Sequence, residues 1–277
     1  MTETTELGWY IDGVPLNTLA WNIETRGGTN KPPSRRGSNV TVPYRPGQRF
    51  VEKTPDSRTV PLKMWVRGCG QDGEIPAGFT AARSQYDQNL SDLQRLFIRD
   101  GQVPVTKKFY ESGVVRSATA LCEFSDGFDT SMIGRTASRF SIDLLLADPY
   151  FYDDDYTQFN LVDGDNTIVL PGHAKTNNIL LTIQGSRNNT IVRNTTLDQQ
   201  VQYTGSLSST QSAVIDVLNF TSVTNPGGAN PTYDSESLVS HEGAPMWLAL
   251  SPGENIINLS STSGAGLVFL QAKGAWF

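Results

Sequence analysis

Residues 136–152, TASRFSIDLLLADPYFY, carry the clearest strand pattern of the chain. Apolar side chains recur at every second position from Phe140 to Leu146, and this spacing places them all on one face of a β-strand. The run ends at Ala147-Asp-Pro-Tyr150. We therefore predict a core strand over 136–146.

The rest of the first half shows further strand patterns. Val60, Leu62, Met64 and Val66 share one face of a strand over 58–66, and residues 103–110 and 114–124 form a hairpin that turns at 111–113. Residues 14–21 follow a turn at Asp12-Gly13 and are expected to form one strand, with Val14, Leu16, Leu19 and Trp21 as its apolar residues. Residues 40–44 are β-like, but Pro43 limits them to an edge or an end.

One amphipathic helix is expected between about Ala81 and Arg99. Its apolar stripe consists of Tyr86, Leu90, Leu93, Leu96 and Phe97. Thr80 is the expected N-cap, and Asp100-Gly101 ends the helix. Because a single apolar stripe must be buried, the helix packs on a sheet, and the first domain is β-rich with one helix.

The second half contains only short strand patterns separated by turns rich in Gly, Asn and Ser. The expected strands are 166–170, 178–184, 189–194, 199–203, 213–216, 246–250, 255–259 and 267–272. Their spacing predicts an antiparallel β-sandwich. In the strand over 246–250, Met246, Leu248 and Leu250 share a face; Trp247 then points the other way, either into packing or towards a sugar that it stacks on.

Charge divides the chain near residue 152. Residues 1–152 contain 18 Lys and Arg against 17 Asp and Glu, whereas residues 153–277 contain 4 against 11. This step predicts domains over 1–152 and 153–277, and the acidic second half argues against specific nucleic-acid binding. No stretch is long and apolar enough to span a bilayer, and the first residues lack the pattern of a signal peptide, so synthesis in the cytoplasm is expected.

The residues that most often carry chemistry do not form a recognisable site in the sequence. Cys69, Cys122, His173 and His241 lie far apart, so neither a zinc site nor a redox pair is expected, and the cysteines are expected to be free. The carboxylates at 153–155 and at 163–165 match no calcium loop and are expected in a linker and in a turn. No nucleophile elbow or phosphate loop occurs. We therefore expect no cofactor, no metal and no enzymatic activity.

A basic, proline-rich loop is the feature that most suggests a function. Between residues 31 and 58 the chain carries Lys31, Arg35, Arg36, Arg45, Arg49, Lys53 and Arg58, against Glu52 and Asp56. Three interpretations remain open: an arm that docks on an acidic surface of a neighbouring subunit, a contact with a DNA backbone, or an ordinary solvated loop. The candidate subunit-interface residues are Arg35, Arg36, Tyr44, Arg45, Arg49 and Phe50.

The order of these features resembles the distal tail protein family of siphophage baseplates. The matching pieces of the first half are 12–16 leading to Trp21-Asn-Ile23, the basic loop, the strand over 59–66, the helix, and 140–152 with its Ala-Asp-Pro-aromatic end. Those of the second half are 178–186, Asn194-Thr-Thr196, Ala213-Val-Ile-Asp216 and Leu250-Ser-Pro-Gly-Glu-Asn-Ile256. The resemblance covers nearly the whole chain.

The resemblance implies a mainly β protein. Residues 1–152 would form a tail-tube-like β-sandwich or barrel with one amphipathic helix and a protruding loop over 26–58, and residues 153–277 a galectin-like antiparallel β-sandwich. The family is not enzymatic. It implies a virion protein of the phage tail tip, a homo-hexameric ring that joins the tail tube to the baseplate hub. The implied partners are the tail tube protein, the hub or tail-associated protein and the tape measure protein.

Two other functions remain open. The second domain can be a carbohydrate-binding adhesin, because a galectin-like fold does not by itself decide whether sugar is bound. The chain can also be the major tail tube protein, although the additional second domain argues against it.

Overall fold

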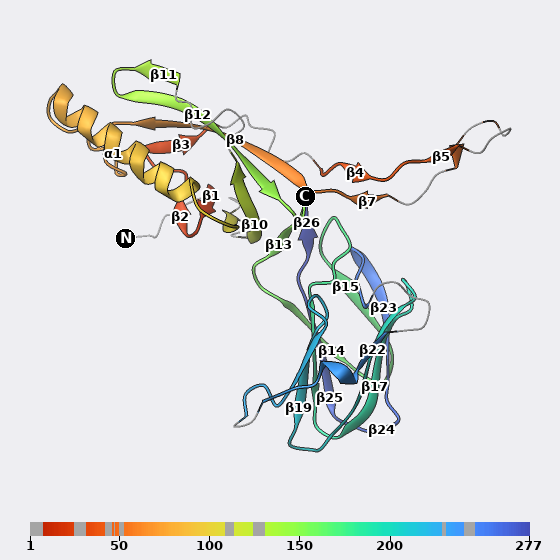
Figure 1. Ribbon diagram of the computed structural model, residues 1–277. Coiled ribbons are helices and arrows are strands. Elements are labelled where there is room, and N and C mark those ends of the chain that lie inside the picture. The colour runs from red at the N-terminus through yellow and green to blue at the C-terminus, as the bar shows by residue number, and fades with distance from the viewer. Residues whose placement is uncertain are drawn as a thin grey trace. The chain divides into compact units, whose positions relative to one another are not determined.

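The computed structural model describes residues 8–24, 32–41, 46, 48–49, 53–108, 114–123, 131–228, 231–240 and 247–277. It is mainly β, as expected, and the described part contains one α-helix. The chain forms two compact units, Met1–Phe151 together with Phe277, and Tyr152–Trp276 (Figure 1). Strand β13 (Phe151–Asp153) lies where the chain passes from the first unit into the second.

The main sheet of the first unit is antiparallel. Its spatial order is β2 (Val14–Pro15), β1 (Gly8–Ile11), β9 (Val103–Lys108), β10 (Val115–Glu123), β12 (Ala137–Leu146), β8 (Arg58–Arg67) and β3 (Trp21–Ile23), and β11 (Ser131–Gly134) pairs with β12. The hairpin expected over 103–124 is confirmed as β9 paired with β10.

Strands β8 and β12 form the centre of this unit's core. They pair over their full length, from Arg58 opposite Leu146 to Arg67 opposite Ala137. The apolar residues expected on one face of each strand are buried: Val60, Leu62, Met64, Val66, Phe140, Ile142, Leu144 and Leu146. The predicted apolar residues of both strands lie on the same face of the sheet. The two strand predictions are therefore confirmed.

Helix α1 (Phe79–Phe97) packs its predicted stripe against this core. Tyr86, Leu93, Leu96 and Phe97 are buried, and Leu90 packs beside them. Asn89 also fixes the helix, since its amide donates at 2.8 Å to the carbonyls of Arg67 and Cys69 at the end of β8. Among the described residues, no helix combines the length and apolarity needed to cross a bilayer.

The expected N-cap of the helix is wrong. Thr80 lies inside α1, and the cap position is Gly78, which makes no side-chain hydrogen bond. Gly78 has φ +87°, a left-handed conformation that glycine adopts without steric cost. The helix therefore begins two residues earlier than predicted because the chain turns at a glycine.

The single strand expected over 14–21 is also wrong. The chain forms β2, then a turn, then β3, so the apolar residues no longer share one face. Leu16 and Trp21 are buried, whereas Leu19 is 50% exposed. Thr18 holds the turn, because its hydroxyl donates to the carbonyl of Trp21 and accepts from the Trp21 backbone N–H.

The second unit consists of two antiparallel sheets around one core. The first sheet runs β14 (Thr157–Leu161), β25 (Leu267–Ala272), β16 (Ile179–Gln184), β19 (Ser212–Asp216), β20 (Thr221–Thr224) and β21 (Thr232–Tyr233). The second runs β15 (Gly164–Leu170), β23 (Gly253–Ser260), β17 (Arg187–Asn194), β18 (Gln199–Leu207) and β22 (Leu238–Ser240), with β24 (Ser263–Gly264) beside β17. A short 3-10 helix, η1 (Ser235–Ser237), precedes β22, and β26 (Ala275–Trp276) ends this part of the chain.

One strand expected in this unit does not form. The described residues 247–250 make only an isolated bridge, between Leu250 and Thr176. The side-chain amide of Asn194 donates to the carbonyl of Ala249 at 2.7 Å. This carbonyl thus has a hydrogen-bond partner without a neighbouring strand. Leu248, Ala249 and Leu250 are all buried, and the predicted alternation of faces is absent.

Candidate functional site

The described residues between 34 and 56 form a two-stranded ribbon, which we call the arm. Strand β4 (Arg35–Arg36) pairs with β7 (Thr54–Pro55), and β5 (Val40–Thr41) pairs with β6 (Gln48–Arg49). Neither ladder pairs with another sheet among the described residues. Figure 1 shows β4, β5 and β7 along one extended hairpin.

The described side chains of the arm are largely outside any core. Arg35, Arg36, Thr54 and Pro55 are all exposed. A two-stranded hairpin without an apolar face to bury is only marginally stable in water. The arm is therefore a surface whose order would increase if another chain covered it.

The structure describes the six candidate interface residues to different extents. Arg35 and Arg36 form β4, so their exposed side chains lie at the base of the hairpin. Arg49 lies in β6, of which only the backbone is described. Tyr44, Arg45 and Phe50 lie outside the described residues, and their placement stays a prediction.

Positive charge continues from the arm into the sheet that carries it. Arg58, the first residue of β8, is only 4% exposed, and its guanidinium lies 5.9 Å from the ring centroid of Phe151. Burial lowers the pKa of Arg58. Burial also lowers the pKa of Lys107, and the positive charges of Arg58 and Arg116 lower it further. The base of the arm is therefore a region where cations lie close together.

Arg35 belongs to the same region. Burial, and then the negative charge of Asp148, raise the pKa of Tyr150, while the positive charge of Arg35 lowers it. Arg35 therefore lies within electrostatic range of Tyr150. Tyr150 begins the aromatic segment 150–152, which follows the predicted strand over 136–146.

The residues that suggested other chemistry have structural surroundings. Among the described residues, no group of three or more His, Cys, Asp or Glu is arranged to hold a metal ion. His173 packs edge-on against Trp276 at 4.8 Å between ring centroids, and His241 lies outside the described residues. Cys69 and Cys122 are free, as predicted, and burial raises the pKa of the Cys122 thiol to about 11, so little thiolate forms at neutral pH.

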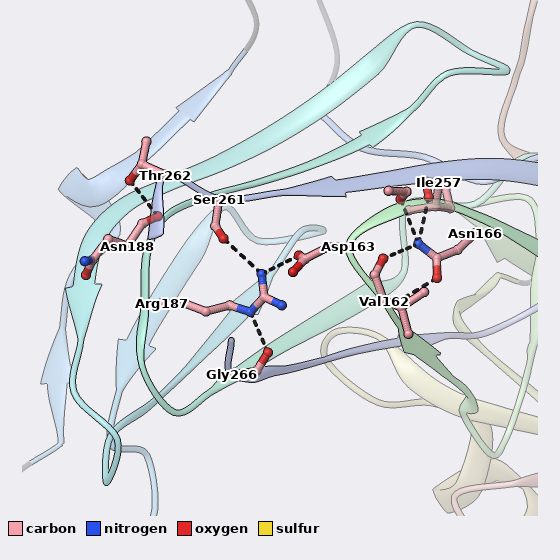
Figure 2. A network of polar contacts seen from close by, with 10 residues as sticks. Val162, Asp163, Asn166, Arg187, Asn188, Ile257, Ser261, Thr262 and Gly266 are labelled. Atoms are coloured by element: carbon pink, nitrogen blue, oxygen red, sulfur yellow. Dashed lines mark hydrogen bonds and ion pairs between the residues drawn. The ribbon is translucent and has the colours of Figure 1, made fainter. Parts of the chain in front are cut away.

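Of the carboxylates at 163–165, which were expected in a turn, Asp163 lies in the bend before β15 and Asp165 lies in β15 itself. Arg187 is only 4% exposed, and its Nη1 lies 2.8 Å from a carboxylate oxygen of Asp163. Figure 2 shows the two side chains facing each other. The same guanidinium donates to Ser261 Oγ and to the carbonyl of Gly266. Asp165 accepts a hydrogen bond from the Asn258 amide. These contacts join three loops of the second unit and give both carboxylates a structural role.

A row of side chains crosses the outer face of the sheet that runs from β14 to β21. The register places Asn160, Phe269, Thr182, Val214, Val223 and Tyr233 side by side, one from each strand. In β25, β16 and β19 the residues on both sides of the row are buried, so the row faces outward there. Tyr233 is 80% exposed. The sequence alone did not reveal this row, because β14, β20 and β21 were not predicted.

Trp247 does not belong to that row. It packs against the core of its unit, and its ring lies 4.5 Å from the ring of Phe220 by centroid distance. Of the two interpretations of this residue, the contacts favour packing.

Comparison with solved structures finds a match over nearly the full length. The SPP1 Dit (gp 19.1) protein, described as a paradigm of the hub adsorption apparatus in phages that infect Gram-positive bacteria, superposes with a TM-score of 0.69. The sequences are 14% identical, and the match covers 97% of this chain and 99% of that one. The resemblance deduced from the order of motifs is thereby confirmed at the level of the fold.

Two structures of the phage P2 baseplate in its activated conformation, with Ca and with Sr, match less well. Their TM-scores are 0.46 and 0.43, each at 8% identity, and they cover 92% and 91% of this chain and 90% of each matched chain. No family model matches the chain, and no curated protein matches its sequence.

Proposed function

We propose that this chain is a non-enzymatic structural protein of a long-tailed phage tail tip. In this proposal, copies of the chain form a closed ring, of six by the family resemblance, that joins the tail tube to the baseplate hub. Its partners are other copies of itself, the tail tube protein, the hub protein and the tape measure protein. The tail-tube-like and galectin-like descriptions of the two units belong to this proposal as well.

The observation that carries the proposal is the arm, in a chain with the fold of a phage hub protein. The arm is a hairpin with exposed cations and without a described partner sheet. Ordering a hairpin costs conformational entropy, and a hairpin that buries little apolar surface does not offset this cost by itself. Contacts with a neighbouring subunit can offset it. A head-to-tail arrangement around an axis closes when the rotation between subunits divides a full turn.

The test measures assembly directly. Light scattering on the purified chain, with negative-stain images of the same peak, is expected to give a ring with the mass of six copies of the 30.3 kDa chain. Arg35→Glu together with Arg36→Glu is expected to weaken this assembly at least about tenfold, because opposite charge is placed in a contact that needs cations.

The control exchanges charge at two exposed acidic residues of the second unit, Glu236→Lys and Glu254→Lys. This pair should leave the ring unchanged. A wild-type chain that stays monomeric at high concentration contradicts the ring, and open filaments instead of rings would favour the tail tube protein.

A second candidate function rests on the outer row of the second unit. Tyr233 and Phe269 offer aromatic surface, and Asn160 and Gln271 lie beside Phe269 as hydrogen-bonding side chains. Aromatic faces with nearby amides are suited to a neutral sugar.

Binding to a glycan array by the intact chain, lost in Tyr233→Ala and Phe269→Ala, would support sugar recognition. Absence of binding at millimolar glycan would exclude it.

A further inference from the structure

The loop between β19 and β20 is ordered, yet it exposes large apolar side chains. It consists of residues 217–220, since the two strands pair up to its ends. Val217 fixes its start, because this residue is only 1% exposed and its N–H donates to the Ile179 carbonyl at 3.0 Å. Leu218 and Phe220, by contrast, are each 43% exposed. Two apolar side chains of a well-anchored loop therefore face solvent.

Phe220 has a backbone conformation that its residue type disfavours. Its φ is +55°, in the left-handed region, where a Cβ crowds the following carbonyl oxygen. The other described residues with a positive φ, glycines apart, are Asp12, Asn189, Asp198 and Asn225. Asparagine and aspartate tolerate this conformation, whereas a bulky aromatic residue is an outlier there. The loop thus accepts a conformational cost at the position where it presents a phenylalanine ring.

Contact with Trp247 holds this ring in place without burying it. The ring centroids of Phe220 and Trp247 lie 4.5 Å apart, and the ring planes are inclined at 53°. Trp247 itself packs against the core of its unit, so the phenylalanine rests on an ordered support. Phe220 nevertheless keeps almost half of its surface exposed. Packing therefore does not account for the strain, and strained residues of this kind are typical of binding sites.

The amide beside the ring is also held in a fixed position. Asn219 is exposed, and its backbone N–H donates to one carboxylate oxygen of Asp216 at 3.1 Å. Its side-chain amide donates to the other carboxylate oxygen at 2.7 Å. An amide has two N–H donors and a carbonyl acceptor, so this bond leaves the side chain with a donor and an acceptor for a ligand. The loop thus holds an aromatic ring and an amide in place before a ligand arrives.

These two groups match the chemistry of a neutral sugar. A sugar ring has an apolar face of C–H groups, which can lie against an aromatic ring, and hydroxyls that donate and accept hydrogen bonds. The Asn219 amide can do both in return. The carboxylate of Asp216 disfavours an anionic ligand, and residues 217–220 contain no Lys or Arg to pair with one. A site that is ordered in advance also loses less entropy on binding.

We propose that the loop over 217–220 binds a neutral saccharide, with Phe220 against the apolar face of a sugar ring and the Asn219 amide bonded to its hydroxyls. Asp216 and Trp247 are positioning residues, since the first orients the amide and the second supports the ring. Leu218 adds apolar area in the same loop. The inference shares its class of ligand with the second candidate function but none of its residues, so the two sites are tested separately.

The test measures binding by the intact chain. An array of neutral and acidic oligosaccharides identifies the strongest neutral ligand, which is then titrated by calorimetry. Phe220→Gly should weaken binding at least about tenfold, because the stacking ring is removed. Asn219→Ala should weaken it roughly threefold to tenfold through lost hydrogen bonds. Phe220→Tyr keeps a ring and should bind like the wild type, as should the matched control Tyr233→Ala, which removes an exposed aromatic ring elsewhere in the sandwich.

Stability distinguishes a binding role of Phe220 from a structural one. Glycine adopts the left-handed conformation without steric cost, so Phe220→Gly should leave the midpoint of urea unfolding little changed. If the midpoint falls, Phe220→Leu and Phe220→Tyr decide, because both keep a large side chain and only tyrosine keeps a ring. Equal affinities of these two variants overturn the inference.

The remaining outcomes distinguish this site from the outer row. Absence of binding to any glycan at millimolar concentration overturns the inference together with the second candidate function. Binding that persists in Phe220→Gly but disappears in Tyr233→Ala places the sugar on the outer row and overturns the inference alone. Binding of acidic glycans only overturns the assigned class of ligand. The proposed ring is independent of all these results, because its test is assembly.

Discussion

The arm and the sandwich of the second unit are both made of antiparallel strands, but they are stabilised differently. Each ladder of the arm has two residue pairs, and the described side chains beside them are mostly exposed. The strands of the sandwich enclose a core in which Leu181, Ile183 and Leu270 are at most 1% exposed. Backbone pairing occurs in both regions, so burial accounts for the difference. A two-stranded region without burial lacks the stabilisation that the sandwich gains from its core.

The turns of the sandwich show how far this region supports itself. Strands β15 and β23 both begin at a glycine with positive φ, Gly164 and Gly253, and both carry an asparagine two residues later. Asn255 accepts from the Ser251 N–H and donates to the carbonyls of Ser251 and Gly253.

Asn166 makes the corresponding three hydrogen bonds with Val162 and Gly164, as Figure 2 shows in part. The two strands also pair with each other, Gly164 opposite Leu259 and Leu170 opposite Gly253. The same local arrangement, a glycine followed two residues later by a hydrogen-bonded asparagine, therefore begins both of these paired strands.

The largest difference between the two regions should appear in proteolysis. We expect trypsin to cut the isolated chain in the arm roughly 100-fold faster than at Arg187 and Arg193 in β17, because the arm opens locally while the sandwich opens only with its core. Mass spectrometry of the first fragments locates the cuts. Equal rates at both regions would contradict the comparison, and assembly into a ring should slow cleavage of the arm.

Within the sandwich, Asn255→Ala should have the larger effect of the two turn substitutions. Asn255 is fully buried and also accepts a hydrogen bond from the Asn194 amide at 3.1 Å. Its removal leaves several buried polar groups without partners, so we expect a loss of about 3 kcal/mol in the free energy of unfolding. Urea denaturation of the intact chain measures this loss. A change below about 1 kcal/mol would mean that water replaces the side chain.

Asn166→Ala is the matched substitution at the partner turn. Asn166 makes the same local bonds but is only half-buried, and its one long-range bond, to the Ile257 carbonyl, is 3.2 Å long. Because water can reach the freed groups, we expect a loss of about 1 kcal/mol. If the two alanine variants lose the same stability, burial is not what separates the two turns.

Asp163→Asn should have the smallest effect. Arg187 is buried, but Asp163 is 58% exposed, and the guanidinium keeps its bonds to Ser261 and Gly266. An ion pair with one exposed partner contributes about 0.5 kcal/mol, and added salt reduces this contribution. Urea denaturation at low and high salt should therefore give a small difference that shrinks with salt. A loss above about 2 kcal/mol would show that the carboxylate is essential to the network.

The sequence was most informative where a period continued over many residues. Strands β8 and β12 and helix α1 were all predicted, because each carries enough periodic apolar residues to indicate both its type and its buried face. The predictions failed over shorter stretches. Thr80 was chosen as N-cap by residue type, while the chain turns at Gly78. Strands β20, of four residues, and β21, of two, are too short to show a recognisable apolar period.

The candidate interface was found only in part from the sequence. The density of Lys and Arg and the prolines marked residues 31–58 as unusual, and Arg35 and Arg36 lie exposed in the arm. The outward position of three large apolar side chains could not be found in this way. Leu19, Ile75 and Phe79 are ordinary apolar residues, and their exposure depends on a turn at Thr18 and on a loop that closes against β8.

By itself, the sequence determined which segments bury a face, because periodic burial depends on the backbone geometry of a single strand or helix. It also determined the basic character of the arm, since charge is a property of composition. Only the tertiary structure decided which apolar residues remain outside, and that the Asn194 side chain binds the backbone carbonyl of Ala249. These depend on contacts between residues far apart in the chain, and a local pattern carries no information about them.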